Sequence, residues 1–312
     1  MTTAWIVLGL FLNYLLVICI LTANIIVIVV LVKHTSLHTP TNIIIGAMAV
    51  ADLGFGLNLT VMVLLEYKTL KSYWTCLVSY CNAIFLGSVS MHMLTIVSID
   101  RYVHITRPLR SHNIINNTRI SIVISCSVIF CFFISFTPVW GLVREDFDAT
   151  VCSPEFFLVT VDFIVTMGST FIISFCITAF VYYKIYRIAI SCRHRVDAET
   201  GNNGTSQLAA HLKAAKLFAT LCGYFLFSWG PYFVVKCLSL IRDRKPLRDE
   251  FSQITLLLAA GNSLGNPLIY AFRSADVKHK LQRMFTNALN RSKPTEENQV
   301  VPTIHVSTEG DE

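Results

Sequence analysis

Charged residues are scarce in this chain. They make up 14% of its 312 residues, whereas soluble domains average about 25%. Hydrophobic residues make up 54% of the chain. So much apolar side chain with so little charge excludes an ordinary soluble domain and indicates a membrane protein.

Several functional signatures are also missing from the sequence. It has no nucleophile–base–orienter set and no cluster of metal-ligating residues, which argues against an enzyme. It has no soluble basic surface with base-stacking or groove-reading elements, so we expect no nucleic-acid partner. It lacks the internal repeat of many secondary transporters, which weakens the one alternative from a different class, a membrane channel or transporter.

Seven apolar runs are each long enough to cross about 30 Å of hydrocarbon as a helix. They cover residues 5–32, 43–65, 77–99, 120–139, 157–183, 214–241 and 254–272. The first lacks the basic start and cleavage site of a secretory signal and is too long for one, so we interpret it as a span. Because a helix satisfies its own backbone hydrogen bonds in lipid, the runs predict an all-α, seven-transmembrane helix bundle.

Basic residues gather in the connections on one side of this predicted bundle. They follow the third, fifth and seventh runs, whereas the opposite connections are mixed or acidic. Positive connections face the cytoplasm. We therefore expect a multi-pass plasma-membrane protein with an extracellular N-terminus and a cytoplasmic C-terminus.

Polar residues inside the runs are functional candidates, because ionisable groups in a bilayer are costly. Asp52 lies mid-run in MAVADLGFG, and hydroxyl and amide side chains in other runs suit a small monovalent cation. The alternative is a polar core that only joins helices. In FLFSWGPYF, Pro231 predicts a kink next to Trp229, which is either a switching element or a tolerated bend. Cys76 and Cys152 are both expected on the extracellular side. The oxidising exterior permits a disulfide between them, and the alternative is two free cysteines.

The motif order resembles that of the rhodopsin-like (class A) G-protein-coupled receptors. The matching features are Asn24, AVAD ending at Asp52, Cys76, IDRY at 99–102, SWGPY at 228–232 and NPLIY at 266–270. The resemblance covers roughly residues 5–287 and implies a seven-transmembrane receptor domain with a short amphipathic eighth helix. We expect a short extracellular N-terminus over residues 1–4 and a disordered cytoplasmic tail over residues 288–312.

The resemblance also implies roles for individual residues. It implies a sodium pocket formed by Asp52, Ser90, Asn262, Ser263 and Asn266. It implies a disulfide between Cys76 and Cys152, and no cofactor other than an allosteric sodium ion. The residues implied in G-protein coupling and switching are Asp100, Arg101, Tyr102, Tyr182, Phe225, Trp229, Pro231, Asn266, Pro267 and Tyr270.

The chain departs from the family pattern at the start of its sixth run. His211 stands where an acid usually restrains the arginine of DRY, here Arg101. Asp100 is then the main restraint on Arg101, and we expect some ligand-independent signalling.

Known ligand anchors of the family are absent from the sequence. Ala83 replaces the aspartate of amine receptors, Ala260 replaces the retinal lysine of opsins, and Lys236 replaces the asparagine of adenosine receptors. Lys236 either pairs with an anionic ligand or extends to the outer interface. The candidate ligand-pocket residues are Ala83, Ile84, Gly87, Thr166, Thr170, Tyr232, Phe233, Lys236 and Leu256.

The resemblance therefore implies a receptor that binds an extracellular small molecule or short peptide and activates heterotrimeric G proteins by outward movement of helix six. Arrestin, a receptor kinase and membrane lipids are the other expected partners. The alternative within the family is an opsin-related receptor that lost its retinal lysine.

Overall fold

The computed structural model describes residues 3–66, 73–140, 161–198, 220, 223–235, 237–238, 249–273, 280, 282 and 286. Within these residues every regular element is a helix, so the predicted all-α class is confirmed. The elements are α1 (Thr3–Lys33), η1 (Thr35–Leu37), α2 (Pro40–Glu66), α3 (Tyr73–Thr106), α4 (Ser111–Ile114), α5 (Asn117–Ser135), η2 (Thr137–Trp140), α7 (Val161–Ala198) and α9 (Asp249–Arg273). Residues 223–235 are also helical and belong to the sixth predicted run.

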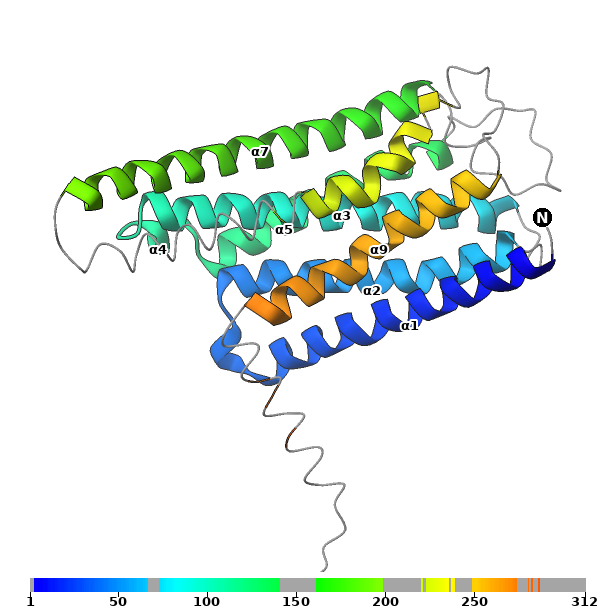
Figure 1. Cartoon of the computed structure of the whole chain (residues 1–312), viewed down its shortest axis with the longest axis horizontal. Coiled ribbons are helices and arrows are strands. Elements are labelled where there is room, and N and C mark those ends of the chain that lie inside the picture. Colours follow the sequence, from blue (N-terminus) through cyan, green and yellow to red (C-terminus); the bar gives the residue numbers. More distant parts are fainter. Residues whose placement is uncertain are drawn as a thin grey trace, which may run out of the picture.

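The long helices lie side by side (Figure 1). α2 packs against both α1 and α3, and α3 packs against α7. The 223–235 helix, yellow in Figure 1, lies between α7 and α9. Two contacts agree with this placement, one between the rings of Phe171 and Phe225 and one between Tyr224 and Gly261. Helices six and seven, the 223–235 helix and α9, are therefore neighbours.

Five helices of the described part are long and apolar enough to cross a membrane. These spans are Val7–Lys33, Pro40–Leu65, Trp74–Thr106, Asn117–Ser135 and Gly168–Ile188. They overlap the first five predicted runs. The 223–235 helix lies within the sixth predicted run, and α9 contains the seventh.

The C-terminal end of the fourth run differs from the prediction. The apolar run 120–139 predicts one continuous helix, but α5 ends at Ser135 and residues Thr137–Trp140 form the 3-10 helix η2. Pro138 explains the break, because proline lacks a backbone N–H and disfavours the α conformation of the preceding residue. The prediction was wrong there because hydropathy does not detect backbone geometry.

Two helices extend past the C-terminal ends of their apolar runs. α3 continues to Thr106 instead of residue 99, and α7 continues to Ala198 instead of residue 183. Their polar last turns remain helical because helix propensity does not require burial in lipid. The DRY segment is consequently part of a continuous helix.

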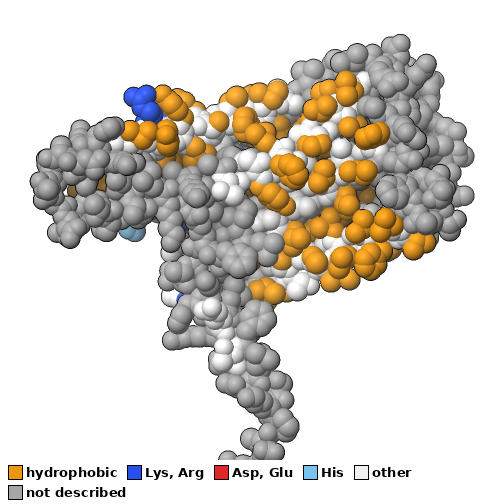
Figure 2. All heavy atoms as spheres, viewed as in Figure 1, with side chains coloured by type: hydrophobic (Ala, Val, Ile, Leu, Met, Phe, Trp, Pro, Cys, Tyr) orange, Lys and Arg blue, Asp and Glu red, His pale blue; other side chains and the backbone are white. Residues whose placement is uncertain are grey.

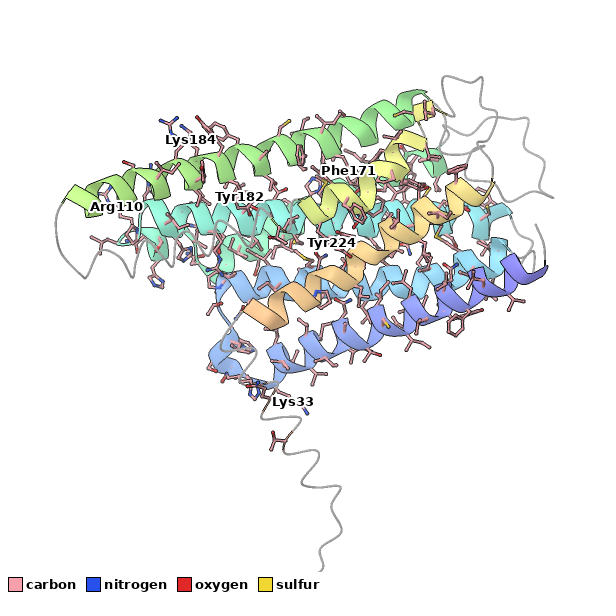
Figure 3. All side chains as sticks on the ribbon, in the orientation of Figure 1. Lys33, Arg110, Phe171, Tyr182, Lys184 and Tyr224 are labelled. Carbon is pink, nitrogen blue, oxygen red and sulfur yellow. The ribbon has the colours of Figure 1, made fainter. Side chains whose placement is uncertain are left out.

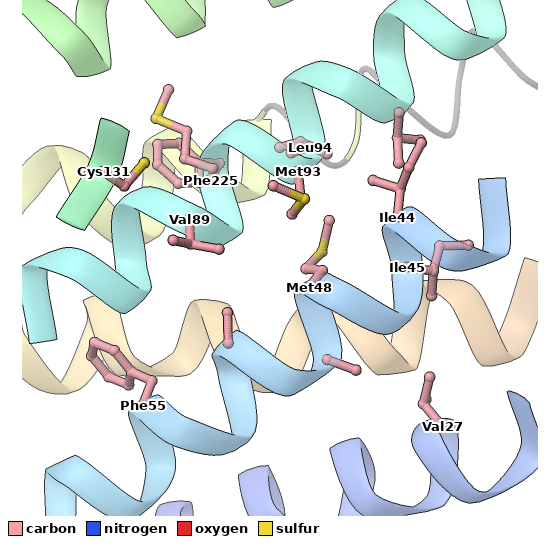
Figure 4. Close-up of a cluster of buried hydrophobic side chains, with 14 of the residues drawn as sticks. Val27, Ile44, Ile45, Met48, Phe55, Val89, Met93, Leu94, Cys131 and Phe225 are labelled. Atoms are coloured by element: carbon pink, nitrogen blue, oxygen red, sulfur yellow. The ribbon is translucent and has the colours of Figure 1, made fainter. Parts of the chain in front are cut away.

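The core consists of the helix faces that point toward one another. On α2, Phe55 is 2% exposed whereas Leu57 is 57% exposed, so one side of the helix is buried and the other is outward. Figure 4 shows Met48 of α2 pointing toward Met93 of α3 inside this core. Figure 2 shows hydrophobic side chains over the outward faces as well, which suits helices surrounded by lipid.

Candidate functional site

The Asp52 carboxylate lies in the middle of the bundle, where α2, α3 and α9 meet. Its side chain is 1% exposed. Asn266 on α9 donates from Nδ2 to Asp52 Oδ2 at 2.9 Å and to the Ser90 hydroxyl on α3 at 3.1 Å. The Ser263 side chain also faces the carboxylate. Asn262 is buried in the same turn of α9.

One oxygen of this carboxylate has no hydrogen bond. Oδ1 of Asp52 is buried and has no hydrogen bond of good geometry among the described residues. A buried anion without full compensation is costly, and a small cation beside Oδ1 would remove that cost. The structure thus brings four of the five predicted sodium-pocket residues together, and Asn262 is buried nearby on α9. Their oxygen atoms suit a monovalent cation.

A second polar contact joins α1 to α9 next to this pocket. Pro267 lacks a backbone N–H, so the carbonyl of Ser263, four residues earlier, loses its helical partner. Asn24 of α1 replaces that partner, because its Nδ2 donates to the Ser263 carbonyl at 3.1 Å. The proline of NPLIY therefore exposes a carbonyl that a buried side chain on another helix satisfies.

The Asp100 carboxylate near the C-terminal end of α3 has three neighbours. Thr41 of α2 donates from its hydroxyl to Asp100 Oδ2 at 2.7 Å. Arg101 Nε lies 3.8 Å from the same oxygen, which is the distance of an ion pair rather than a hydrogen bond. His104 Nδ1 lies 3.4 Å from Asp100 Oδ1 and 2.8 Å from the Asp100 backbone carbonyl.

The two charged side chains of the DRY motif differ in how far they are exposed. The Asp100 side chain is fully buried, whereas the Arg101 side chain is 39% exposed. Arg101 therefore reaches the solvent-facing surface of the bundle while it remains next to its partner. The predicted Asp100–Arg101 pair exists, and Tyr102 packs against the core in the following position.

Two polar contacts join α3 to α7 at successive turns. The hydroxyls of Thr95 and Thr178 are 3.1 Å apart. The hydroxyl of Tyr182, one turn further, forms a hydrogen bond with the hydroxyl of Ser98. Figure 3 shows Tyr182 between the two helices. Tyr182 is buried at this position, so any swing of its ring would require α7 to separate from α3.

Trp229 lies at the centre of an aromatic cluster. Its ring centroid is 5.8 Å from that of Phe171, 6.3 Å from that of Phe225 and 6.1 Å from that of Tyr232. Phe171 and Phe233 are closer still, with centroids 4.5 Å apart. Such pairs add about 0.5–1.5 kcal/mol each beyond their buried area. The cluster therefore connects α7 to the 223–235 helix just before Pro231.

Gly87 of α3 is the surface on which Trp229 rests. A Cβ atom at Gly87 would lie 2.8 Å from both Cη2 and Cζ2 of Trp229, closer than real Cβ contacts. Gly87 was predicted to line the ligand pocket. The structure also makes it the position that allows the indole to approach the α3 backbone.

The other predicted pocket residues divide into groups. Ala83 is buried in the main core, and Tyr232, Phe233 and Leu256 pack against that core. Ile84 instead packs against a separate cluster formed by Cys76, Leu77 and Cys81, which lies toward α5 and η2. Thr170 is half-buried on α7.

Several predictions concern residues beyond those described. Cys152, Lys236 and His211 lie outside the described residues, as do the side chains of Thr166 and Tyr270 and most of the expected eighth helix. Cys76 is disulfide-bonded, and Cys19, Cys81, Cys126, Cys131, Cys176 and Cys237 are free. The pairing with Cys152 stays a prediction.

The connection between α3 and α4 presents an apolar side chain that sequence patterns did not indicate. Leu109 is 97% exposed. It follows Pro108, and the basic residues Arg107 and Arg110 flank this pair. An isolated exposed leucine is ordinary, but one placed beside exposed arginines next to the DRY helix suits contact with a partner protein.

Four residues with contacts at these sites belong to no family motif and were not predicted: Thr41, His104, Phe171 and Tyr224. The spacing of His104, four residues after Asp100, was a signal for that contact. Thr41 and Phe171 had no such signal, since their partners are distant in sequence.

Comparison with known proteins agrees with this architecture. A family model described as "7 transmembrane receptor (rhodopsin family)" matches residues 23–270. Similar curated proteins include adenosine receptor A2b of Homo sapiens, 25% identical over 287 residues, which are 85% of this chain and 86% of that protein. Trace amine-associated receptor 1 of Mus musculus is 31% identical over 281 residues, 83% of this chain and 82% of that protein. The visual pigment-like receptor peropsin of Homo sapiens is 24% identical over 278 residues, 87% of this chain and 82% of that protein.

Proposed function

This chain belongs to the rhodopsin family of 7 transmembrane receptors, and from that premise we propose that it activates heterotrimeric G proteins at its cytoplasmic face. The family consists of receptors rather than enzymes, so the polar residues in the bundle serve signalling rather than catalysis. The observation that carries the proposal is the Asp100–Arg101 pair, with a buried acid and a partly exposed base at the inner end of α3.

The proposed mechanism exchanges the partner of Arg101. In the resting state Arg101 lies beside Asp100, which Thr41 also holds. When helix six moves outward at Pro231, Arg101 leaves Asp100 for the G protein. Agonist and G protein both favour the open state, so each increases the affinity for the other.

The aromatic cluster is the proposed link between ligand and helix six. Trp229 packs against Gly87 on α3 and against Phe171 on α7, directly before Pro231. A ligand above Trp229 that changes this packing would bias the kink below it. Phe225, one turn further in, would transmit the change toward the cytoplasmic end, where Tyr182 and Tyr270 are proposed to move inward.

We further propose that sodium occupies the Asp52 pocket and stabilises the resting state. The oxygen atoms of Asp52, Ser90, Asn262, Ser263 and Asn266 support this, as does the buried Asp52 Oδ1, which accepts no hydrogen bond from the part of the chain that the structure describes. Sodium bound only by the closed pocket shifts the equilibrium away from signalling.

The proposed ligand is an extracellular small molecule or short peptide. The names of the similar proteins point to adenosine, trace amines and visual pigments, yet Ala83, Ala260 and Lys236 replace the corresponding anchors in this chain. An opsin-related receptor without its retinal lysine is the alternative, and retinal-dependent absorbance of the purified protein would support it.

The proposed location is the plasma membrane, with the N-terminus outside and the C-terminus inside. Figure 3 shows Arg110 and Lys184 toward the end of the bundle opposite the N-terminus, as expected for a cytoplasmic end. Arrestin, a receptor kinase and membrane lipids are proposed as further partners of that end.

A G-protein dissociation assay in cells tests the proposal. Cells with the receptor are expected to show a basal signal above that of empty-vector cells, and Arg101→Ala at equal surface expression should abolish it. A ligand screen with the same readout would then identify the agonist. A signal that is unchanged in Arg101→Ala would contradict coupling through this site.

A further inference from the structure

Tyr224 joins the 223–235 helix to α9 through both parts of its side chain. Its hydroxyl donates to the backbone carbonyl of Gly261 at 2.5 Å. Its ring lies directly against Gly265, one turn further along α9. Figure 3 shows Tyr224 between the two helices. We call these two interactions together the Tyr224–α9 contact.

Two glycines of α9 make this contact possible. A Cβ atom at Gly265 would overlap Cε1 of Tyr224 and lie only 2.6 Å from its Cζ. Gly261 lies on the same face of α9, because four residues make about one helical turn. Small residues with this spacing allow a neighbouring helix to approach the backbone closely. Any residue larger than glycine at position 265 would therefore occupy the space that the Tyr224 ring fills.

The same turn of α9 forms part of the Asp52 pocket. Gly261 and Gly265 face Tyr224, whereas Asn266 reaches Asp52 and Ser90. Any displacement of α9 that alters one contact consequently affects the other. The position of helix six and the geometry of the buried carboxylate are joined through one short segment, GNSLGN.

The sequence of helix six lacks one restraint that the family usually has. The acid that usually holds its cytoplasmic end to the DRY arginine is replaced by His211. Contacts within the bundle must then oppose outward movement. The Tyr224–α9 contact is one of them, about one turn on the cytoplasmic side of Trp229.

We propose that Tyr224 is a positioning residue that holds helix six against α9 in the resting state, and that helix six moves outward when this contact breaks. The inference rests on the proposed signalling function and names the internal restraint that this function requires. The proposed restraint needs both the Tyr224 hydroxyl, which donates to the Gly261 carbonyl, and a glycine at position 265, which leaves room for the ring.

The first test removes only the hydroxyl. Loss of one neutral hydrogen bond from the resting state should raise the ratio of open to closed receptor about fivefold. Tyr224→Phe should therefore raise basal G-protein activation by about that factor at equal surface expression. Tyr14→Phe is the matched control, because Tyr14 lies on the outward face of α1 at 40% exposure.

The second test uses the steric part of the contact. Gly265→Ala should raise basal activation and lower the thermal unfolding temperature, because its methyl group displaces the Tyr224 ring. In a Tyr224→Leu background the same substitution should have a much smaller effect on both measurements, because the ring is gone. Equal effects of Gly265→Ala in both backgrounds would overturn the proposal.

A third measurement does not depend on a G protein. Backbone hydrogen exchange of the receptor in lipid nanodiscs should become faster over residues 223–235 in Tyr224→Phe, with α2 unchanged. Faster exchange without any Arg101-dependent signal would support the Tyr224–α9 contact and count against the proposed G-protein coupling. Unchanged exchange together with an unchanged basal signal would overturn the contact as a restraint, whatever the coupling.

Discussion

The hydroxyl of Thr41 on α2 donates a 2.7 Å hydrogen bond to Asp100 Oδ2 on α3, the same oxygen that Arg101 approaches to 3.8 Å. The neutral donor is thus closer to the buried carboxylate than the charged one. Asp100 is held by α2 whether or not Arg101 is present. Arg101 is therefore not the only group that holds Asp100, which suits the proposed exchange of Arg101 for a G protein.

Asp100→Asn should raise basal signalling about fivefold. The substitution removes the charge that attracts Arg101 but leaves an oxygen that accepts from Thr41. Because Arg101 is 39% exposed, solvent screening limits the pair to about 1 kcal/mol, which corresponds to that factor. The measurement is basal G-protein activation per receptor at the cell surface.

Asp100→Ala is the informative comparison for that variant. It should raise the basal signal similarly but unfold at a lower temperature than Asp100→Asn, because the Thr41 hydrogen bond is also lost. A basal signal that stays at the wild-type level in both variants would contradict the role of Asp100.

Asp52→Asn should make basal signalling insensitive to sodium. In the wild type, replacing sodium by potassium at constant ionic strength should raise the basal signal about fivefold or more, as is typical of coupling between two sites. The variant lacks the charge that binds the cation. Asp100→Asn, which lies far from the pocket along α3, should keep the sodium response, and an equal response in Asp52→Asn would disprove the sodium site.

Gly87→Ala should destabilise the receptor by about 1–3 kcal/mol, because the added methyl group would lie 2.8 Å from the Trp229 ring. Thermal unfolding of the purified receptor measures the change. Gly168→Ala is the control, since a Cβ atom there has nothing within 4 Å and alanine favours helix. Trp229→Phe should relieve the effect of Gly87→Ala, and a similar loss of stability at both glycines would argue against the contact.

Leu109→Ala should reduce G-protein activation about fivefold to tenfold while the unfolding temperature stays unchanged. A side chain that is 97% exposed contributes little to the fold, whereas an apolar anchor in an interface typically contributes more than about 1 kcal/mol. Ile122→Ala on the outward face of α5 is the matched control. Full coupling by Leu109→Ala would show that this leucine is not part of the partner surface.

Cys76→Ser should lower stability by about 2–5 kcal/mol and reduce surface expression, because it removes a disulfide. Cys126→Ser, at a free and exposed cysteine, should have little effect. If Cys152 is the partner, the double variant of Cys76 and Cys152 should be no less stable than Cys76→Ser alone. An additional loss in the double variant would assign the partner elsewhere.

The helices and their order were predictable from composition because each apolar run must form a helix in lipid. Helix ends were less predictable. α5 ends early at Pro138, and α7 continues fifteen residues past its apolar run, since backbone geometry and polar helix propensity are not part of hydropathy. The disulfide pairing, the role of Lys236 and the eighth helix stay predictions.

Composition, run length and motif order were sufficient for the family and for the candidate residues Asp52, Asp100, Arg101 and Trp229. Run length and the free-energy cost of an ionisable group in the bilayer can be read from one segment of sequence at a time. Which helix supplies the partner of each residue is a non-local property, and only packing decided it. Thr41 meets Asp100 across 59 positions and Tyr224 meets Gly261 across 37, contacts that depend on how helices approach in space.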